Sequence, residues 1–152
     1  TPADNFTATA KLQLTAKDQN QLGGIIMMGL DYSALVVKRV GDEFQLQQIT
    51  CHKADKKGTE AVKVLATFAP TSIDKIDYQP AMHHSSYLRM VVKQGKVNFY
   101  FSKDGKSFKK VGDEFTMREG KWIGAKVGMV AKEPAGKTNR GWIDVDWFRI
   151  TK

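Results

Sequence analysis

The sequence predicts an all-β fold, built as a two-sheet antiparallel sandwich. Apolar and polar side chains alternate along several stretches, which is the period-two pattern of a strand with one buried and one solvated face. Turn signals separate these stretches at short intervals, and about ten short strands with such spacing are typical of a sandwich. No segment keeps the three-to-four spacing of apolar residues that an amphipathic helix needs, so few helices are expected.

Four stretches carry the clearest strand patterns. Residues 6–14, 87–93 and 97–101 alternate between apolar and polar side chains. Residues 24–30 contain only apolar residues and glycine, which predicts a central strand covered on both faces. The chain of 152 residues has one domain's length and shows no internal repeat or boundary, so residues 1–152 are expected to form a single domain.

Turn residues predict where the strands reverse. The pair at 94–95 separates two strand patterns, and the run at 103–106 predicts a hairpin with Asp104 and Gly105 in a tight type I′ turn. Residues 40–42 and 111–113 predict further hairpin corners.

Two stretches break the strand pattern. Residues 70–86 contain two prolines and a histidine pair and are expected to form a long loop. Residues 132–140 are polar, contain glycine and proline, and are expected to form an exposed loop before the last strand.

Composition disfavours several classes of partner. The net charge is +8, but the lysines are spread along the whole chain rather than gathered on one surface with stacking aromatics, so no nucleic-acid partner is expected. No apolar run is long enough for a membrane span. The chain starts with Thr-Pro, which indicates a processed or excised fragment. The single cysteine, Cys51, is expected to be a reduced and half-buried thiol, because no second cysteine exists to pair with it.

The residues offer little for a metal site. Three histidines are present, His52, His83 and His84, and two neighbouring histidines do not by themselves supply the convergent ligands of a zinc site. We therefore expect no metal ligands among them and no cofactor. The sequence leaves open whether the domain binds a structural calcium ion, held in part by backbone carbonyls.

One pair of carboxylates is a candidate for acid/base catalysis. Glycosidases use two carboxyl groups that flank the scissile bond, and Asp144 and Asp146 share one face of the predicted last strand. Their neighbours Ile143, Val145 and Trp147 supply an apolar face, so the pattern also fits an ordinary half-buried strand. We expect no catalytic residue in this chain.

The tryptophans fall late in the sequence. Trp147 is expected to pack, whereas Trp122 lies in a glycine-flanked segment between Glu119 and Gly124. A tryptophan in such a loop either fills the core or presents a flat apolar face and an N–H donor to a sugar or a partner. The residues alone leave both readings open.

The last third of the chain resembles the C-terminal concanavalin-like sandwich of glycoside hydrolase family 43, whose members are β-xylosidases and arabinofuranosidases. The early segment at 24–32 fits the same domain, so the resemblance covers nearly the whole chain. The motifs that carry it are the segments 100–108 (YFSKDGKSF), 118–128 (REGKWIGAKVG) and 144–149 (DVDWFR).

The resemblance implies a concanavalin A-like, laminin G-like jelly roll beside a catalytic five-bladed β-propeller, which a chain of this length does not hold. In some members the sandwich lends an aromatic to the rim of the catalytic pocket, and Trp122 matches that place. This chain departs from members with consecutive phenylalanines there, because Lys121 precedes Trp122. The resemblance also implies a periplasmic or extracellular location, since plant polysaccharides are met outside the cytoplasm.

Three hypotheses follow. The first is a non-catalytic accessory domain of a hemicellulose-degrading glycosidase, docked on the propeller with Trp122 and Lys121 contributing to the pocket or to docking. The second is an independent carbohydrate-binding module that stacks an oligosaccharide on Trp142 or Tyr32 in a concave face. The third, a hydrolase centred on Asp144 and Asp146, is the weakest.

Overall fold

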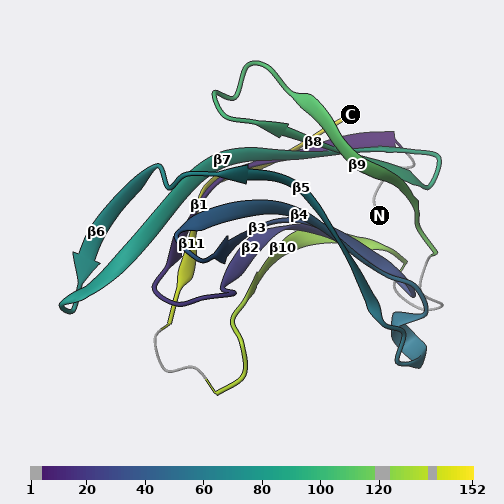
Figure 1. Ribbon diagram of the computed structural model, residues 1–152. Coiled ribbons are helices and arrows are strands. Elements are labelled where there is room, and N and C mark those ends of the chain that lie inside the picture. Colours follow the sequence, from purple (N-terminus) through teal and green to yellow (C-terminus); the bar gives the residue numbers. More distant parts are fainter. Residues whose placement is uncertain (1–4, 119–123, 137–139) are drawn as a thin grey trace.

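The computed structural model describes residues 5–118, 124–136 and 140–152 and contains two stacked antiparallel sheets (Figure 1). Sheet A has the strand order β11-β1-β7-β8-β9, and β6 pairs with residues 79–83 at the start of β7. Sheet B has the order β10-β2-β3-β4-β5. The predicted sandwich is confirmed. Within the described ranges the strands are β1 (Asn5–Ala16), β2 (Leu22–Met28), β3 (Tyr32–Val40), β4 (Glu43–Cys51), β5 (Glu60–Phe68), β6 (Ser72–Ile76), β7 (Gln79–Lys93), β8 (Lys96–Ser102), β9 (Lys109–Thr116), β10 (Lys126–Lys132) and β11 (Trp142–Thr151), and the single helical turn is η1 (Ala54–Lys56).

The core lies between the two sheets. Alternate residues of β1 point inward, as the sequence pattern predicts, and they meet the inward residues of β2, β3 and β4. Both sheets bend in the same direction, and sheet B forms the inner layer of the resulting arch (Figure 1). The largest fully buried side chains are Phe44, Phe99, Leu12, Leu14, Ile25 and Met27.

Strand β2 is covered on one face only, so the prediction of a strand buried on both faces was wrong. Ile25 and Met27 belong to the core, but Ile26 and Met28 lie on the opposite face of sheet B, which no other element covers within the described ranges. The continuous apolar run therefore reflects an apolar outer face, not a third layer.

The region 70–86 is a hairpin, not the long loop that the sequence predicted. Strands β6 and β7 pair through a turn at Asp77 and Tyr78, both of which have positive φ angles. Pro80 is tolerated because it sits at the start of β7, before β1 joins the other edge at Met82.

Two turn predictions also need correction. The connection from β8 to β9 spans residues 103–108 instead of a two-residue turn, because the Asp104 carboxylate accepts the N–H groups of Lys106 and Ser107 and widens the loop. Only Gly105 of the predicted pair has a positive φ. Residues 111–113 lie within β9, where Gly112 accompanies a register irregularity and not a corner.

A β-bulge changes which residues of the last strand face the core. The register between β1 and β11 shifts between Lys11 and Leu12, which leaves Asp146 as the extra residue of β11. Ile143 packs on the core before the bulge and Phe148 after it, although the two are five positions apart. The predicted loop before β11 is confirmed for residues 133–136 and 140–141.

Candidate functional site

Each of the two carboxylates on β11 is bound to a neighbouring side chain. Asp144 accepts the indole N–H of Trp142 at 2.9 Å, and Asp146 forms an ion pair with Lys11 at 2.9 Å, which raises the pKa of the lysine through its hydrogen bond and charge. Both aspartates are exposed. The general acid of a glycosidase is a desolvated carboxyl group, whereas these two carboxylates are exposed to solvent and bound to neighbours.

His83 sits in a chain of polar groups that looks catalytic at first. Its Nδ1 lies 2.9 Å from Thr15 Oγ1 and 3.0 Å from Gln13 Nε2, and its Nε2 lies 3.4 Å from an Asp74 carboxylate oxygen. The Gln13 amide donates to Nδ1, which assigns the ring proton to Nε2 on the Asp74 side. Thr15 is only 1% exposed, so its hydroxyl is out of reach of a substrate and the chain of groups is structural.

His84 and Cys51 are also buried. His84 stacks on Phe68 and contacts Phe44, and burial together with the Lys103 charge lowers the pKa of its imidazole to about 4. Cys51 is a buried free thiol whose Sγ lies 3.3 Å from the Gly58 carbonyl oxygen. Among the described residues no three His, Cys, Asp or Glu side chains gather as a metal site would require.

Trp142 and Tyr32, each a candidate for stacking a sugar, lie in different sheets. Trp142 starts β11 in sheet A, with Lys17 Nζ 5.5 Å from its ring centroid. Tyr32 starts β3 on the outer face of sheet B, where its hydroxyl donates to Glu60. Burial first, and then Glu60, raise the pKa of the tyrosine. The two rings therefore belong to different faces of the sandwich.

The outer face of sheet B is aliphatic. Met28, Val62 and Val64 are 48%, 54% and 52% exposed, and buried or half-buried apolar side chains lie between them. In the concave layer of the arch this surface surrounds a hollow of about 200 Å³. We call it the concave face. Glu60 and Lys132 also line its hollow, and its apolar residues are Leu22, Ile26, Met28, Tyr32, Ala34, Val36, Ile49, Val62, Val64 and Val130.

A buried carboxylate organises the end of the sandwich beside this face. Asp31 is 4% exposed, and it accepts hydrogen bonds from Arg118 Nε at 2.8 Å and Arg118 Nη2 at 2.6 Å. The backbone N–H of Lys53 donates to it at 2.6 Å, and His52 Nδ1 lies 3.4 Å away. The Arg118 guanidinium outweighs burial and holds the pKa of Asp31 well below its usual range.

The same end joins three loops. The Arg118 carbonyl accepts the N–H of Leu30 at 2.9 Å, and the Ala54 N–H donates to the Leu30 carbonyl at 3.0 Å. A side chain at Gly29 would meet the Arg118 carbonyl oxygen at 2.3 Å, so this close approach requires glycine. The pattern of residues 24–30 predicted a strand here but did not reveal Asp31 and Arg118, because their partnership spans 87 positions in sequence.

Comparison with known proteins identifies the fold's family. The sequence profile of the beta-xylosidase C-terminal concanavalin A-like domain matches residues 1–151. The chain belongs to this family. It thus corresponds to the C-terminal part of β-xylosidase-type enzymes of glycoside hydrolase family 43, as the resemblance implied.

Three proteins that this chain resembles are much longer than it is. It is 27% identical to a beta-xylosidase from Formosa agariphila over 142 residues, which are 93% of the chain but 20% of that protein. The fold resembles the xylan beta-1,4-xylosidase from Bacillus halodurans C-125 with a TM-score of 0.73 at 16% identity, covering 100% of this chain and 28% of that one.

A further structural neighbour is a GH43B protein of the Bacteroides ovatus xyloglucan locus, with a TM-score of 0.69, 18% identity and coverage of 98% and 27%. At these identities the solved structures show the fold alone. The chain spans between a fifth and a third of these three relatives.

Trp122 and Lys121, the predicted pocket or docking residues, lie outside the described residues of this family member. What the structure does describe are the two sides of their segment, Arg118 before it and the buried Ala125 after it. In the described parts of the chain, no helix is long and apolar enough to cross a membrane.

Proposed function

We propose that the chain is a non-catalytic accessory domain of a secreted, periplasmic or extracellular glycoside hydrolase that acts on xylan- or arabinan-type polysaccharides. It docks on the catalytic β-propeller of the same polypeptide and helps to shape the substrate pocket. Family membership supports this role, and so does the length of the relatives, most of which lies outside the part that this chain matches. The observation that carries the docking proposal is the concave face.

The chemistry of the concave face favours a protein partner over a sugar. An exposed apolar surface in water is unfavourable by about 25 cal/mol per Å², and contiguous patches on soluble proteins commonly mark contacts. Sugar rings stack on flat aromatic side chains. Here Tyr32 is the one aromatic residue of the face, and its hydroxyl is already bonded to Glu60, while Met28, Val62 and Val64 dominate the exposed surface.

The concave face also has room for a protruding partner. Gly128 of β10 pairs with Ile26 of β2 on the outward side of sheet B. A Cβ at Gly128 would have no atom within 4 Å, so the backbone is open to solvent there. Half-buried Ile26 and Val130 flank this opening with aliphatic walls.

Docking on this face would place the partner beside the segment that carries Trp122. Met28 closes the concave face at one end, and the next residue, Gly29, touches the backbone of Arg118. Arg118 is fixed by Asp31 and precedes residue 119 directly. A propeller that covers Met28 would therefore adjoin the start of the 119–123 segment, and we propose that Trp122 and Lys121 reach the pocket rim from there.

Kinetics of the full-length parent enzyme test the pocket role. Trp122→Ala is expected to lower kcat/KM for xylosides roughly tenfold or more, equivalent to about 1.4 kcal/mol of transition-state stabilisation. Tyr78→Ala is the matched control, because Tyr78 is a fully exposed aromatic on the β6–β7 turn. Kinetics that Trp122→Ala leaves unchanged would contradict pocket shaping.

A second variant of the full-length enzyme tests the docking face. Gly128→Arg introduces a large charged side chain into the concave face at a position where the fold leaves open space. Docked domains are expected to unfold together in one thermal transition, and Gly128→Arg is expected to separate this transition into two and to lower kcat/KM. Ser72→Arg, on the exposed edge strand β6, is expected to do neither. A single unchanged transition in Gly128→Arg would rule out docking through this face.

A further inference from the structure

We propose that the open side of the sandwich, between the edge strands β5 and β9, binds a medium-chain alkyl carboxylate. Strand β5 is the last strand of sheet B and β9 is the last strand of sheet A, and a hollow of about 580 Å³ lies between them. We call it the seam pocket. Its apolar lining consists of Leu46, Leu65, Ala66, Phe68, Phe101 and Val111, and three lysines, Lys103, Lys109 and Lys110, also line it. Apolar walls with a few polar groups are typical of small-molecule sites.

Irregular pairing in both edge strands shapes the pocket. The register between β4 and β5 shifts at a bulge, which leaves Leu65 as the extra residue of β5. Strand β9 also has an irregular register, and a Cβ at its Gly112 would lie 2.4 Å from Gln48 Oε1 and 3.6 Å from Leu65 Cδ1. The two edges therefore meet at this end. The pocket extends from there along both strands toward Phe68 and Lys109.

One of the lysines lies on the core-facing side of its strand. Lys109 and Val111 are two positions apart on β9, and they pair with Phe101 and Phe99, which both belong to the core. Because alternate residues of a strand share a face, Lys109 lies on the same face as these core residues. Its side chain is exposed, since the seam pocket opens to solvent there. The charge of Lys109 therefore lies where a ligand in the pocket would meet it.

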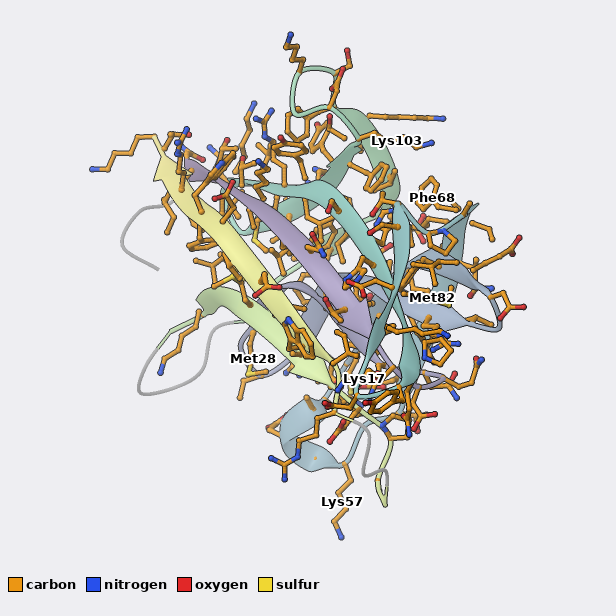
Figure 2. All side chains as sticks on the ribbon, turned by 90° about the vertical axis from the view of Figure 1, so that its left-hand side faces the viewer. Lys17, Met28, Lys57, Phe68, Met82 and Lys103 are labelled. Carbon is orange, nitrogen blue, oxygen red and sulfur yellow. The ribbon has the colours of Figure 1, made fainter. Side chains whose placement is uncertain are left out.

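A second lysine lies beside the aromatic part of the lining. Lys103 Nζ is 4.9 Å from the ring centroid of Phe68, and Figure 2 shows both residues on the same side of the molecule. Among the residues that the structure describes, none of the three pocket lysines forms an ion pair with a carboxylate. Their ammonium groups are thus available to an anion.

The charge balance of the pocket favours an anion over a cation. Asp104 is the one carboxylate among the described residues that line it. This carboxylate accepts the N–H groups of Ser107 at 3.0 Å and Lys106 at 2.8 Å and the Ser102 hydroxyl at 3.0 Å, and these bonds lower the pKa of Asp104 to about 2. It is therefore ionised at neutral pH, and the three lysines outnumber it. A carboxylate is attracted to such a site, whereas an alkylammonium ion is repelled.

The apolar walls fit an alkyl chain better than a ring. The Phe68 ring is stacked on Phe101 at a centroid distance of 5.0 Å and on His84 at 5.3 Å. An aromatic or sugar ring needs a free aromatic face for stacking. The other apolar side chains of the lining are aliphatic, namely Leu46, Leu65, Ala66 and Val111. Residues 65–68 span roughly 10 Å at the rise of an extended strand, which is about the length of an extended decanoate chain.

The seam pocket is separate from the concave face. In the described parts of the chain, no residue that defines the concave face lines the seam pocket. Alkyl carboxylate binding therefore does not depend on docking against a propeller. The Trp122→Ala and Gly128→Arg experiments address other parts of the domain, so either function can fail without the other.

Titration of the 152-residue chain with decanoate at pH 8 tests the site, by calorimetry and by NMR shifts of the backbone amides. Decanoate is expected to bind with a dissociation constant on the order of 0.1 mM. The amide resonances of Leu65, Lys103 and Gly112 should shift, and that of Gly128 on the concave face should not. Decanol should bind at least about fivefold more weakly, and decyltrimethylammonium should not compete with decanoate.

Two lysine substitutions and one filling substitution locate the site. Lys103→Met and Lys109→Met each remove a charge but keep an unbranched side chain, and together they should abolish the preference for decanoate over decanol. Lys75→Met, at an exposed position of β6, should keep that preference. Ala66→Phe fills the pocket and is expected to weaken the binding of both ligands at least about tenfold.

Two results would overturn the proposal. Absence of saturable decanoate binding would leave Lys109 as a charge that only keeps the edge strand β9 from pairing with another chain. An unchanged preference for decanoate in the double lysine variant would place the anion outside the seam pocket.

Discussion

The side-chain amide of Gln48 binds both backbone groups of Asp113, as a neighbouring strand would. Gln48 Nε2 donates to the Asp113 carbonyl at 2.9 Å, and the Asp113 N–H donates to Gln48 Oε1 at 2.8 Å. Gln48 comes from β4 in sheet B and Asp113 from β9 in sheet A, so one buried side chain links the two sheets where β9 has its irregular register.

Replacing the Gln48 amide should lower the free energy of unfolding much more than replacing an exposed glutamine does. Gln48→Met keeps the volume but leaves the N–H and C=O of Asp113 without their partner, and we expect a loss of about 2 kcal/mol in the free energy of unfolding. Urea denaturation measures the loss. Gln79→Met, at an exposed position of β7, should change the free energy by less than about 0.5 kcal/mol. Equal effects of the two substitutions would show that the link contributes nothing.

The Asp31–Arg118 pair should dominate the stability of its end of the sandwich. Asp31→Ala removes the buried acceptor of the hydrogen bonds from Arg118 and the Lys53 N–H, and it is expected to lower the free energy of unfolding by about 3 kcal/mol. Asp113→Ala breaks an exposed ion pair with Lys63 and should cost no more than about 1 kcal/mol. Thermal or urea unfolding of both variants gives the comparison, and similar losses would contradict a special role for Asp31.

Acid should weaken the fold in two steps with different origins. The pKa of His84 falls from 6.5 to about 4 in the folded state, chiefly through burial, so the unfolded chain binds its proton first. Stability is therefore lost as the pH falls from about 6.5 to about 4, by up to about 3 kcal/mol. Asp31 has a lowered pKa, so its contribution is present above about pH 4 and is lost below it.

A single substitution separates these steps. His84→Phe retains an aromatic ring against Phe44 and Phe68 but removes the titrating group. The free energy of unfolding, measured by urea denaturation from pH 8 to pH 4, should then lose its slope between pH 6.5 and 4. A slope that persists in the variant would assign the acid sensitivity to other groups.

The sequence was sufficient for the fold class because the sandwich depends on local signals. The alternation in β1, β7 and β8 was visible residue by residue, and the Gln94-Gly95 turn marked the boundary between β7 and β8. The hairpin at 72–83 was missed because Pro80 and the two histidines resemble a loop locally. Only the pairing partner shows that the proline sits where no ladder hydrogen bond is needed.

The candidate sites could not be predicted from local sequence signals, because they depend on pairings between distant residues. Asp31 and Arg118 meet only through the fold, and Asp144, Gln13 and Ser85 lie in one row only through the register of three strands. The apolar run at 24–30 was visible, but whether another layer covers its second face is a property of the whole topology. The β11 bulge likewise has no local signal that distinguishes Asp146 from its neighbours.

Replacing Gly24 or Gly128 with alanine should have different effects on the free energy of unfolding. A Cβ at Gly24 would lie 2.0 Å from the Leu35 carbonyl oxygen and 2.7 Å from the Val36 Cα, and backbone atoms in a central strand have no room to move aside. A Cβ at Gly128 would meet nothing within 4 Å, on the edge strand β10. Gly24→Ala is expected to lower the free energy of unfolding by about 3 kcal/mol or more.

Gly128→Ala, in contrast, should leave stability unchanged or raise it by up to about 1 kcal/mol, because alanine reduces the freedom of the unfolded chain without a clash. Urea denaturation of both alanine variants measures the difference, and equal losses would contradict the described approach of β3 to β2. The tolerance of Gly128 matters for the docking experiment, because a larger residue at that position then perturbs the partner surface and not the fold. A Gly128→Ala variant that unfolds would remove that separation, and the effect of Gly128→Arg on the full-length enzyme would have to be attributed to the domain itself.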